Sequence, residues 1–370
     1  MRFSYYVNPQ TPGPEHDRRM LYEVLGQVDL AEKLGFADVW LTEHHFTGYN
    51  TYSDALTLAA AISQRNPSLN IGFAVNVVPL MHPIRFVTQC NLLDQLTDGK
   101  VIVGIGPGNS PDEFAGYGVD VEKRHEIMME FLEVCDLAWD TPRDAGGFEH
   151  HGKHYDLTVR GRIIPEPVQQ PRPVIAYASA TPERLEMAGR RGWSLLLGPQ
   201  KPEILAARLH HFFDGMDEGE LTEEQRALAW KHTSVLRQVY VAEEGENWLE
   251  TMDDVIDTYV RKSARANSGI DDLDQTDYDR RRTQYMEGGW LHAGTADEVF
   301  ERLRPFAEIG ISNLMCWMAF GHNTDERVRG SLERFAKDVA PRLQEVEVNR
   351  DLLPQLVASS EMKTHPAIYT

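Results

Sequence analysis

Eight short apolar runs lie along the chain, and segments with helical periodicity separate them. The runs are rich in β-branched and aromatic residues and lie at 3–7, 37–41, 71–78, 101–105, 174–178, 193–197, 235–241 and 311–317. Runs of this length and composition predict buried strands, and their alternation with helices predicts a parallel sheet. Eight such units favour an α/β fold of the closed (β/α)8 TIM-barrel type, with inserted loops, over an open sheet.

The segments between the runs predict where helices begin and end. The first helix is expected over 18–34 and stops at Gly35, since glycine adopts the left-handed conformation that ends many helices. Two segments interrupt the alternation. Residues 143–173 are rich in proline and glycine and predict an ordered excursion or a hairpin. Residues 267–289 are nearly all polar and predict a long loop, which is either a lid or a solvated surface segment.

No linker divides the chain, so we expect one domain over residues 1–343 and a C-terminal tail over 344–370.

Composition limits the classes of partner that this chain could bind. The net charge of −20 argues against a nucleic-acid or anionic membrane surface, although one local basic pocket remains possible. Three widely spaced cysteines indicate a reducing compartment. The N-terminus resembles a strand rather than a signal peptide, and no run could span a bilayer, so a cytoplasmic location is expected.

Polar residues with titratable side chains follow the second apolar run, at Thr42, Glu43, His44, His45 and Phe46. The carboxyl ends of barrel strands are where this fold keeps its chemistry. Side chains alternate between the faces of a strand, so His44 should face away from Glu43 and His45. This parity disfavours a metal site and leaves one imidazole free for proton transfer. The alternative is that backbone carbonyls satisfy both histidines.

Three further strand ends should meet His44 on the same rim. Ala74, Val75 and Asn76 would let a flat ligand approach the backbone. The turn 104–109 contains three glycines but lacks the dinucleotide-binding spacing, and it is either a tight turn or a phosphate loop. Ser179, Ala180 and Thr181 precede a helix, whose N-terminus they could cap or use to bind a phosphate. Arg124, at the start of another helix, could supply the counter-charge.

Ordered motifs along the chain carry a family resemblance. They are Glu43-His44-His45-Phe46, the stretch 77–85 followed by Asn91-Leu92-Leu93-Asp94-Gln95, the glycine-rich 104–108, and the closing 294–299 and 341–343. This set resembles the bacterial luciferase-like flavin-dependent monooxygenases from residue 3 to residue 343. The resemblance implies a TIM barrel that binds reduced FMN at its C-terminal rim, a separate NAD(P)H:flavin reductase that supplies the flavin, and a homodimer.

The resemblance also implies roles for single residues. His44 matches the histidine that assists C4a-hydroperoxyflavin chemistry, and Ala74-Val75 matches a strand end where a non-prolyl cis peptide can support the flavin ring. Arg124 and the segment Ser179, Ala180 and Thr181 match the phosphate cradle. Two positions depart from the family pattern. Gly106 stands where luciferases have a reactive cysteine next to the flavin, which argues against light emission, and Pro107 stands where many members have a phosphate-binding arginine.

The resulting prediction is an enzyme that uses reduced FMN and O2 to oxygenate a small, fairly apolar organic substrate, without a metal. Three alternatives remain at this point. A deazaflavin (F420)-dependent oxidoreductase of the same superfamily would transfer hydride instead. A non-catalytic flavin-binding protein would show no turnover. A metal-dependent barrel hydrolase is disfavoured by the opposite facing of His44 and His45.

Overall fold

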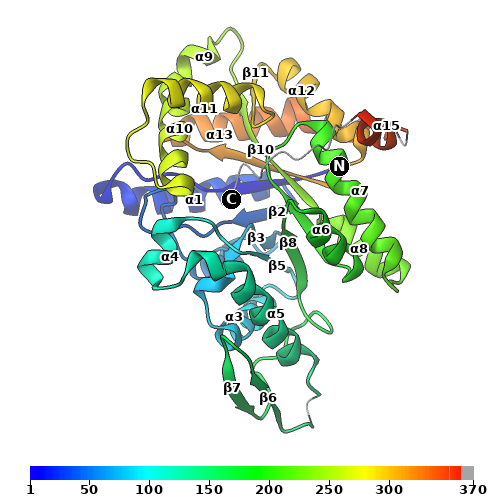
Figure 1. The fold of residues 1–370 in the computed structure, drawn as a ribbon. Coiled ribbons are helices and arrows are strands. Elements are labelled where there is room, and N and C mark those ends of the chain that lie inside the picture. Colours follow the sequence, from blue (N-terminus) through cyan, green and yellow to red (C-terminus); the bar gives the residue numbers. More distant parts are fainter. Residues whose placement is uncertain (143, 350, 360–370) are drawn as a thin grey trace.

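The predicted barrel is present (Figure 1). The computed structural model describes residues 1–142, 144–349 and 351–359. Its eight barrel strands are β1 (Arg2–Val7), β2 (Asp38–Leu41), β3 (Asn70–Phe73), β5 (Val101–Gly106), β8 (Val174–Ala178), β9 (Ser194–Leu197), β10 (Ser234–Val241) and β12 (Asn313–Ala319). Neighbouring strands pair in parallel, and the pairings of β12 with β1 and of β9 with β10 close the barrel.

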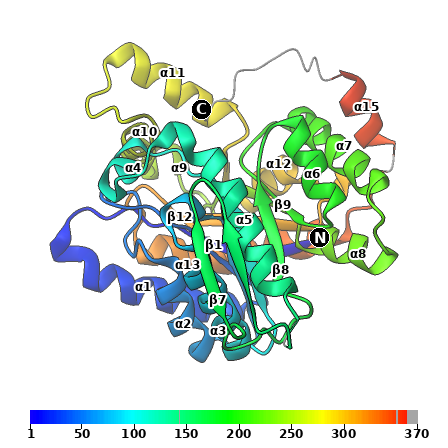
Figure 2. The ribbon, with the colours of Figure 1, turned by 60° about the horizontal axis from the view of Figure 1, so that its bottom comes forward.

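Helices lie on the outside of the barrel and at one of its ends (Figures 1 and 2). They are α1 (Pro14–Lys33), α2 (Ala55–Arg65), α3 (Pro83–Leu96), α4 (Pro111–Tyr117), α5 (Arg124–Asp140), α6 (Pro182–Arg190), α7 (Pro202–Glu218), α8 (Glu223–His232), α9 (Trp248–Thr251), α10 (Asp253–Ser268), α11 (Gln275–Glu287), α12 (Ala296–Ile309), α13 (Asp325–Arg334), α14 (Ala340–Glu345) and α15 (Leu352–Ser359). Gly35 ends the first helix as predicted, with φ of 84°. In the described part of the chain, no helix is long and apolar enough to cross a membrane.

The interpretation of residues 267–289 as a loop is wrong, because α11 occupies most of this segment. The Asp274 side chain caps the helix by accepting a hydrogen bond from the Asp277 backbone N–H. Tyr278 and Tyr285, seven residues apart, are the buried residues of this helix. A stripe of two tyrosines in a polar segment gives too weak a periodic signal to predict a helix. Strand β11 (Leu291–Gly294), which pairs with the upper half of β10, was also not predicted.

The excursion predicted for 143–173 contains a hairpin of β6 (Gly147–His151) and β7 (Asp156–Arg160), seen at the front of Figure 2. Arg143, at its start, lies outside the described residues. The carboxylate of Glu130 on α5 holds the turn, since it accepts hydrogen bonds from the backbone N–H of Tyr155 at 2.7 Å and of His154 at 3.0 Å. The hairpin is therefore fixed to the body of the barrel.

Residues 351–359 also lie on the barrel. The described part of the tail that we expected from residue 344 onward contains α15, which lies alongside α7. Leu352, Leu353 and Leu356 pack against the outer core. Residues 350 and 360–370 lie outside the described residues.

The two ends of the barrel interior differ in chemistry. At the N-terminal end, the buried carboxylate of Asp38 lies 2.6 Å from Ser4 Oγ, accepts a 3.1 Å hydrogen bond from Asn313, and forms an ion pair with Arg2. Above this polar layer, Trp40 fills the interior and is fully buried. The N-terminal end is therefore closed, and a ligand site has to lie at the other rim.

Candidate functional site

Glu43, which is buried, and His45, which is partly buried, form a pair on the rim after β2. His45 Nε2 lies 2.9 Å from Glu43 Oε1, and the other oxygen of Glu43 accepts a 2.9 Å hydrogen bond from the Val77 backbone N–H. Burial raises the pKa of Glu43. Burial opposes charge on His45, but the hydrogen bond and charge of Glu43 outweigh it and raise the pKa of His45. The pair joins this rim to the strand end after β3.

His44 faces a different set of groups. Its Nδ1 lies 3.1 Å from Oε1 of Glu113 on α4, and the same oxygen accepts a 3.0 Å hydrogen bond from the His45 backbone N–H. The ring of Tyr49 meets the His44 ring edge-on, with centroids 4.9 Å apart. Among the described residues, Nε2 of His44 has no hydrogen-bond partner. The carboxylate thus orients the imidazole and leaves Nε2 available to a ligand.

A non-prolyl cis peptide joins Ala74 and Val75, as the resemblance implied. Two side chains hold the backbone around this bond. Tyr6 Oη donates a 3.3 Å hydrogen bond to the Ala74 carbonyl, and the fully buried Asn76 donates one of 3.1 Å to the Gly104 carbonyl. Asn76 therefore supports the strand end from behind, and Ala74 and Val75 are the more exposed members of this group.

Glycines on β5 allow this strand to approach the cis peptide. A Cβ at Gly104 would overlap the carbonyl oxygen of Phe73, and one at Gly106 would lie 2.8 Å from Val75 Cγ2. Gly106 pairs with Val77 of β4 (Asn76–Val77). The close packing of β5 against the segment that holds Phe73 and Val75 thus requires residues without a side chain at 104 and 106.

Cationic and polar groups gather where α5 and α6 begin. Ser179, Ala180 and Thr181 lead from β8 into α6, and the side chain of Thr181 leaves the helix N-terminus uncapped. Arg184 NH1 lies 3.3 Å from His125 Nε2. Burial, with the charges of Arg184 and Arg124, lowers the pKa of His125 to about 4.

In the part of the chain that the structure describes, no carboxylate neutralises the charges of this cluster. Among the described residues, Arg124 and Arg184 form no ion pair with a carboxylate, and Arg124 donates only to the Val121 carbonyl, at 2.9 Å. Nδ1 of His125 is buried and lacks a partner. Two guanidinium groups, a free imidazole nitrogen and a helix N-terminus fit a phosphate group.

Four residues of this rim were not predicted from the sequence. Glu113 and Tyr49 contact His44, and His125 and Arg184 join Arg124 at the helix N-termini. Arg184 could have been found, since it lies in the first turn of the helix that Ser179–Thr181 introduce. Glu113 and His44 are 69 positions apart in the sequence, so no local sequence pattern predicts their contact.

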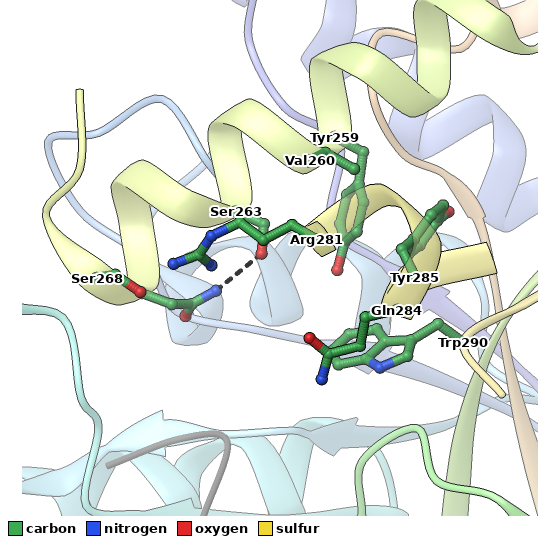
Figure 3. A pocket seen from close by; sticks show the side chains of 9 residues that line it. Tyr259, Val260, Ser263, Ser268, Arg281, Gln284, Tyr285 and Trp290 are labelled. Atoms are coloured by element: carbon green, nitrogen blue, oxygen red, sulfur yellow. Dashed lines mark hydrogen bonds between the residues drawn. The ribbon is translucent and has the colours of Figure 1, made fainter. Parts of the chain in front are cut away.

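A pocket of about 510 Å³, including space open to solvent, lies between α10 and α11 (Figure 3). Its lining residues are Tyr259, Val260, Ser263, Asn267, Ser268, Arg281, Gln284, Tyr285 and Trp290. The rings of Tyr49 and Tyr259 have centroids 6.3 Å apart, and their hydroxyl oxygens are 3.4 Å apart. Tyr49 therefore connects the pocket to His44.

Comparison with known proteins identifies the family. Residues 1–313 match the luciferase-like monooxygenases, so the chain belongs to this family. Over 362 residues it is 23% identical to the oxygenase component of a flavin-dependent trigonelline monooxygenase from Acinetobacter baylyi. The aligned region covers 95% of this chain and 98% of that protein. The expected barrel and the expected enzyme class, a monooxygenase-type oxidoreductase, are confirmed.

Two solved structures share the fold. The oxygenating constituent of 3,6-diketocamphane monooxygenase from Pseudomonas putida, a type II Baeyer–Villiger monooxygenase in complex with FMN, has a TM-score of 0.74 and 18% identity. The superposed region covers 92% of this chain and 98% of the chain in that structure. An F420-dependent secondary alcohol dehydrogenase with an F420–acetone adduct has a TM-score of 0.71 and 18% identity, with the same coverage of 92% and 98%. One barrel thus serves both cofactor chemistries.

Proposed function

We propose that this protein is the oxygenase component of a two-component monooxygenase, which uses reduced FMN and O2 to oxygenate a small organic substrate. The observation that carries the proposal is the cationic cluster of Arg124, His125 and Arg184 at the helix N-termini, on the same rim as His44 and the cis peptide. This rim would combine a site for a phosphate, a backbone segment on which a flat ring could lie, and an oriented imidazole.

Different residues of the rim would bind the phosphate and the ring of FMN. The phosphate would be held by Arg124, Arg184 and Ser179, with the backbone amides of Ala180 and Thr181 adding donors. The isoalloxazine would lie on the surface formed at Ala74, Val75 and Gly106. Asn76 would support that surface through Gly104. Reduced FMN, when bound, would supply the electrons that activate O2, so that one oxygen atom enters the substrate and the other leaves as water.

His44 would move the proton. Its Nδ1 lies 3.1 Å from the carboxylate of Glu113, which would orient the ring so that Nε2 faces a ligand. Nε2 would then give a proton to, or accept one from, the reacting oxygen. The separate Glu43–His45 pair would fix the rim rather than react, since its groups bond to each other and to Val77.

Oxygen transfer needs a site from which water is excluded. We propose that α11 and the rest of 267–289 form a lid, which is one of the two alternatives that the sequence left open for this segment, although as a helix instead of a loop. Tyr278 and Tyr285 attach the helix, and Gly288 and Gly289 follow it. Trypsin should cut near the arginines at 280–282 more slowly when flavin is bound, and equal rates with and without flavin would argue against a lid.

A reductase and a second copy complete the proposal. The relative from Acinetobacter baylyi is named as an oxygenase component, which supports delivery of the flavin by a separate NAD(P)H:flavin reductase.

We also propose a homodimer, whose interface would include apolar side chains that are exposed in the single chain. Leu92 and Leu96 on α3 are exposed, as is Ile164, and Gln95 of α3 donates a hydrogen bond to the Glu166 carbonyl at 2.8 Å. Analytical ultracentrifugation of the wild type and of Leu92→Lys tests this interface.

The decisive experiment is an anaerobic titration with reduced FMN, oxidised FMN, reduced riboflavin and reduced F420. Reduced FMN should bind most tightly, and riboflavin should bind more weakly because it lacks the phosphate. Mixing the complex with O2 in a stopped-flow instrument then reports whether flavin oxidation is delayed relative to free flavin. Preferential binding of F420 would favour the hydride-transferring alternative, and tight flavin binding without substrate-dependent O2 uptake would favour the non-catalytic one.

A further inference from the structure

The pocket between α10 and α11 has two chemically different sides (Figure 3). Tyr259, Tyr285 and Trp290 form an aromatic side, with ring centroids 4.8 Å apart for Tyr259 and Tyr285 and 6.5 Å apart for Tyr259 and Trp290. Arg281 lies on the other side, near Ser263. A ligand that fills this pocket therefore meets rings at one end and a guanidinium group at the other.

Arg281 differs from the arginines on either side of it. Arg280 pairs with Asp277 at 2.9 Å, and Arg282 pairs with Asp253 at 2.6 Å. Among the described residues, Arg281 makes no ion pair or hydrogen bond, and its Nε is buried without an acceptor. A buried donor without a partner is costly, and a carboxylate is the group that a guanidinium binds best, through two parallel hydrogen bonds.

The position of the aromatic side fixes how a ligand would lie. Tyr259 neighbours Tyr49, and Tyr49 contacts the ring of His44. A molecule with its negative group on Arg281 would therefore stack its ring against Tyr259 and extend toward His44. The carboxylate end would stay away from the reacting position.

We propose that the pocket binds the substrate and that this substrate is an aromatic or heteroaromatic carboxylate, anchored by Arg281. The inference rests on the proposed function, because it places the substrate of that reaction. It refines the expectation of a fairly apolar substrate. The rings still provide an apolar site, and the unpaired guanidinium selects for one anionic group within a chain of net charge −20.

Calorimetric titration of the full-length protein with benzoate, phenylacetate and 2-naphthoate, each compared with its neutral amide, tests the proposal. The carboxylates should bind roughly 10- to 100-fold more tightly than the amides, the scale of a charge-assisted hydrogen-bonded pair. Arg281→Gln should remove this preference and leave amide binding unchanged. Arg280→Gln, which removes the same charge from the neighbouring position, should retain it.

Equal binding of acids and amides, failure of every carboxylate to bind, or an unchanged preference in Arg281→Gln would each overturn the proposal. If Arg281→Gln does not fold, Arg281→Lys keeps the charge but loses the two-bond geometry, and it should weaken only carboxylate binding. Titration with reduced FMN separates the two hypotheses. Normal flavin binding without carboxylate preference refutes the substrate class alone, and carboxylate preference without flavin binding refutes the proposed function.

Discussion

Replacement of Arg184 by Gln tests the phosphate site most directly. The guanidinium of Arg184 lies 3.3 Å from His125, at the start of α6, and it has no carboxylate partner among the described residues. Gln keeps much of the side chain's length but removes the charge. The variant should therefore fold normally and lose a contact that matters only when an anion is bound.

The expected magnitude follows from the loss of one charge-assisted hydrogen bond. Such a bond contributes about 1.5–3 kcal/mol, which corresponds to a roughly 10- to 100-fold weaker affinity for FMN. Riboflavin, which lacks the phosphate, should bind the variant and the wild type alike. Arg190→Gln is the matched control, because Arg190 lies on the same helix but pairs with Glu218 at 2.8 Å on the surface.

The imidazole of His125 provides a second measurement that is independent of activity. Burial first, and then Arg184 and Arg124, hold its pKa at about 4. Arg184→Gln should raise that pKa, although it should stay below the ordinary value of 6.5 because burial remains. FMN binding should raise it as well, since the phosphate brings negative charge. NMR titration of the His125 ring measures both changes. A pKa that responds to neither, together with equal losses of FMN and riboflavin binding, would refute the assignment of the phosphate site.

Three further predictions concern the rim, the strand packing and acid stability. His44→Ala should slow oxygenation by about two to four orders of magnitude with little change in flavin affinity, because this is the usual effect of losing a general acid or base. Single-turnover kinetics measures the rate, and a near-normal rate would show that His44 has only a structural role. Gly104→Ala should lower the free energy of unfolding by about 3 kcal/mol or more, because its Cβ would overlap the Phe73 carbonyl, whereas Gly198→Ala, which meets nothing within 4 Å, should be nearly neutral in urea denaturation. Burial lowers the pKa of His232 to about 4 and of His292 to about 3, so between those values and 6.5 the unfolded chain binds protons that the folded one does not. The free energy of unfolding of the unliganded protein should therefore fall as pH drops below about 6.5, and a flat profile from pH 7 to pH 5 would contradict this.

The barrel could be predicted because each of its strands is a local signal. The run 37–41, for example, is apolar except for Asp38, and its residues Asp38–Leu41 form β2. Gly35 marks the preceding helix end through its conformational freedom alone. Where the signal is weak, prediction failed, as for α11, in which Tyr278 and Tyr285 are the buried residues of a polar helix.

The site could be predicted only in part, for a different reason. His44, Ser179 and Arg124 could be chosen because strand ends and helix starts collect functional groups. Partners distant in sequence could not be chosen, and Glu113 reaches His44 only through the packing of α4 on the rim. The unpaired state of Arg281 is likewise invisible in the sequence, because Arg280 and Arg282 beside it have the same charge and are neutralised.

The polar layer around Asp38 has a consequence for how the chain can fold and be divided. Its hydrogen-bond partner Asn313 lies 275 positions further along the chain. During synthesis, the first strands leave the ribosome long before that partner exists, so until β12 arrives the carboxylate has only its partners in the early part of the chain, such as Arg2 and Ser4. Contacts so distant in sequence slow folding. A fragment that ends before β12 would bury Asp38 without Asn313, so we expect complementation by split halves to succeed only when the last strand is supplied in trans.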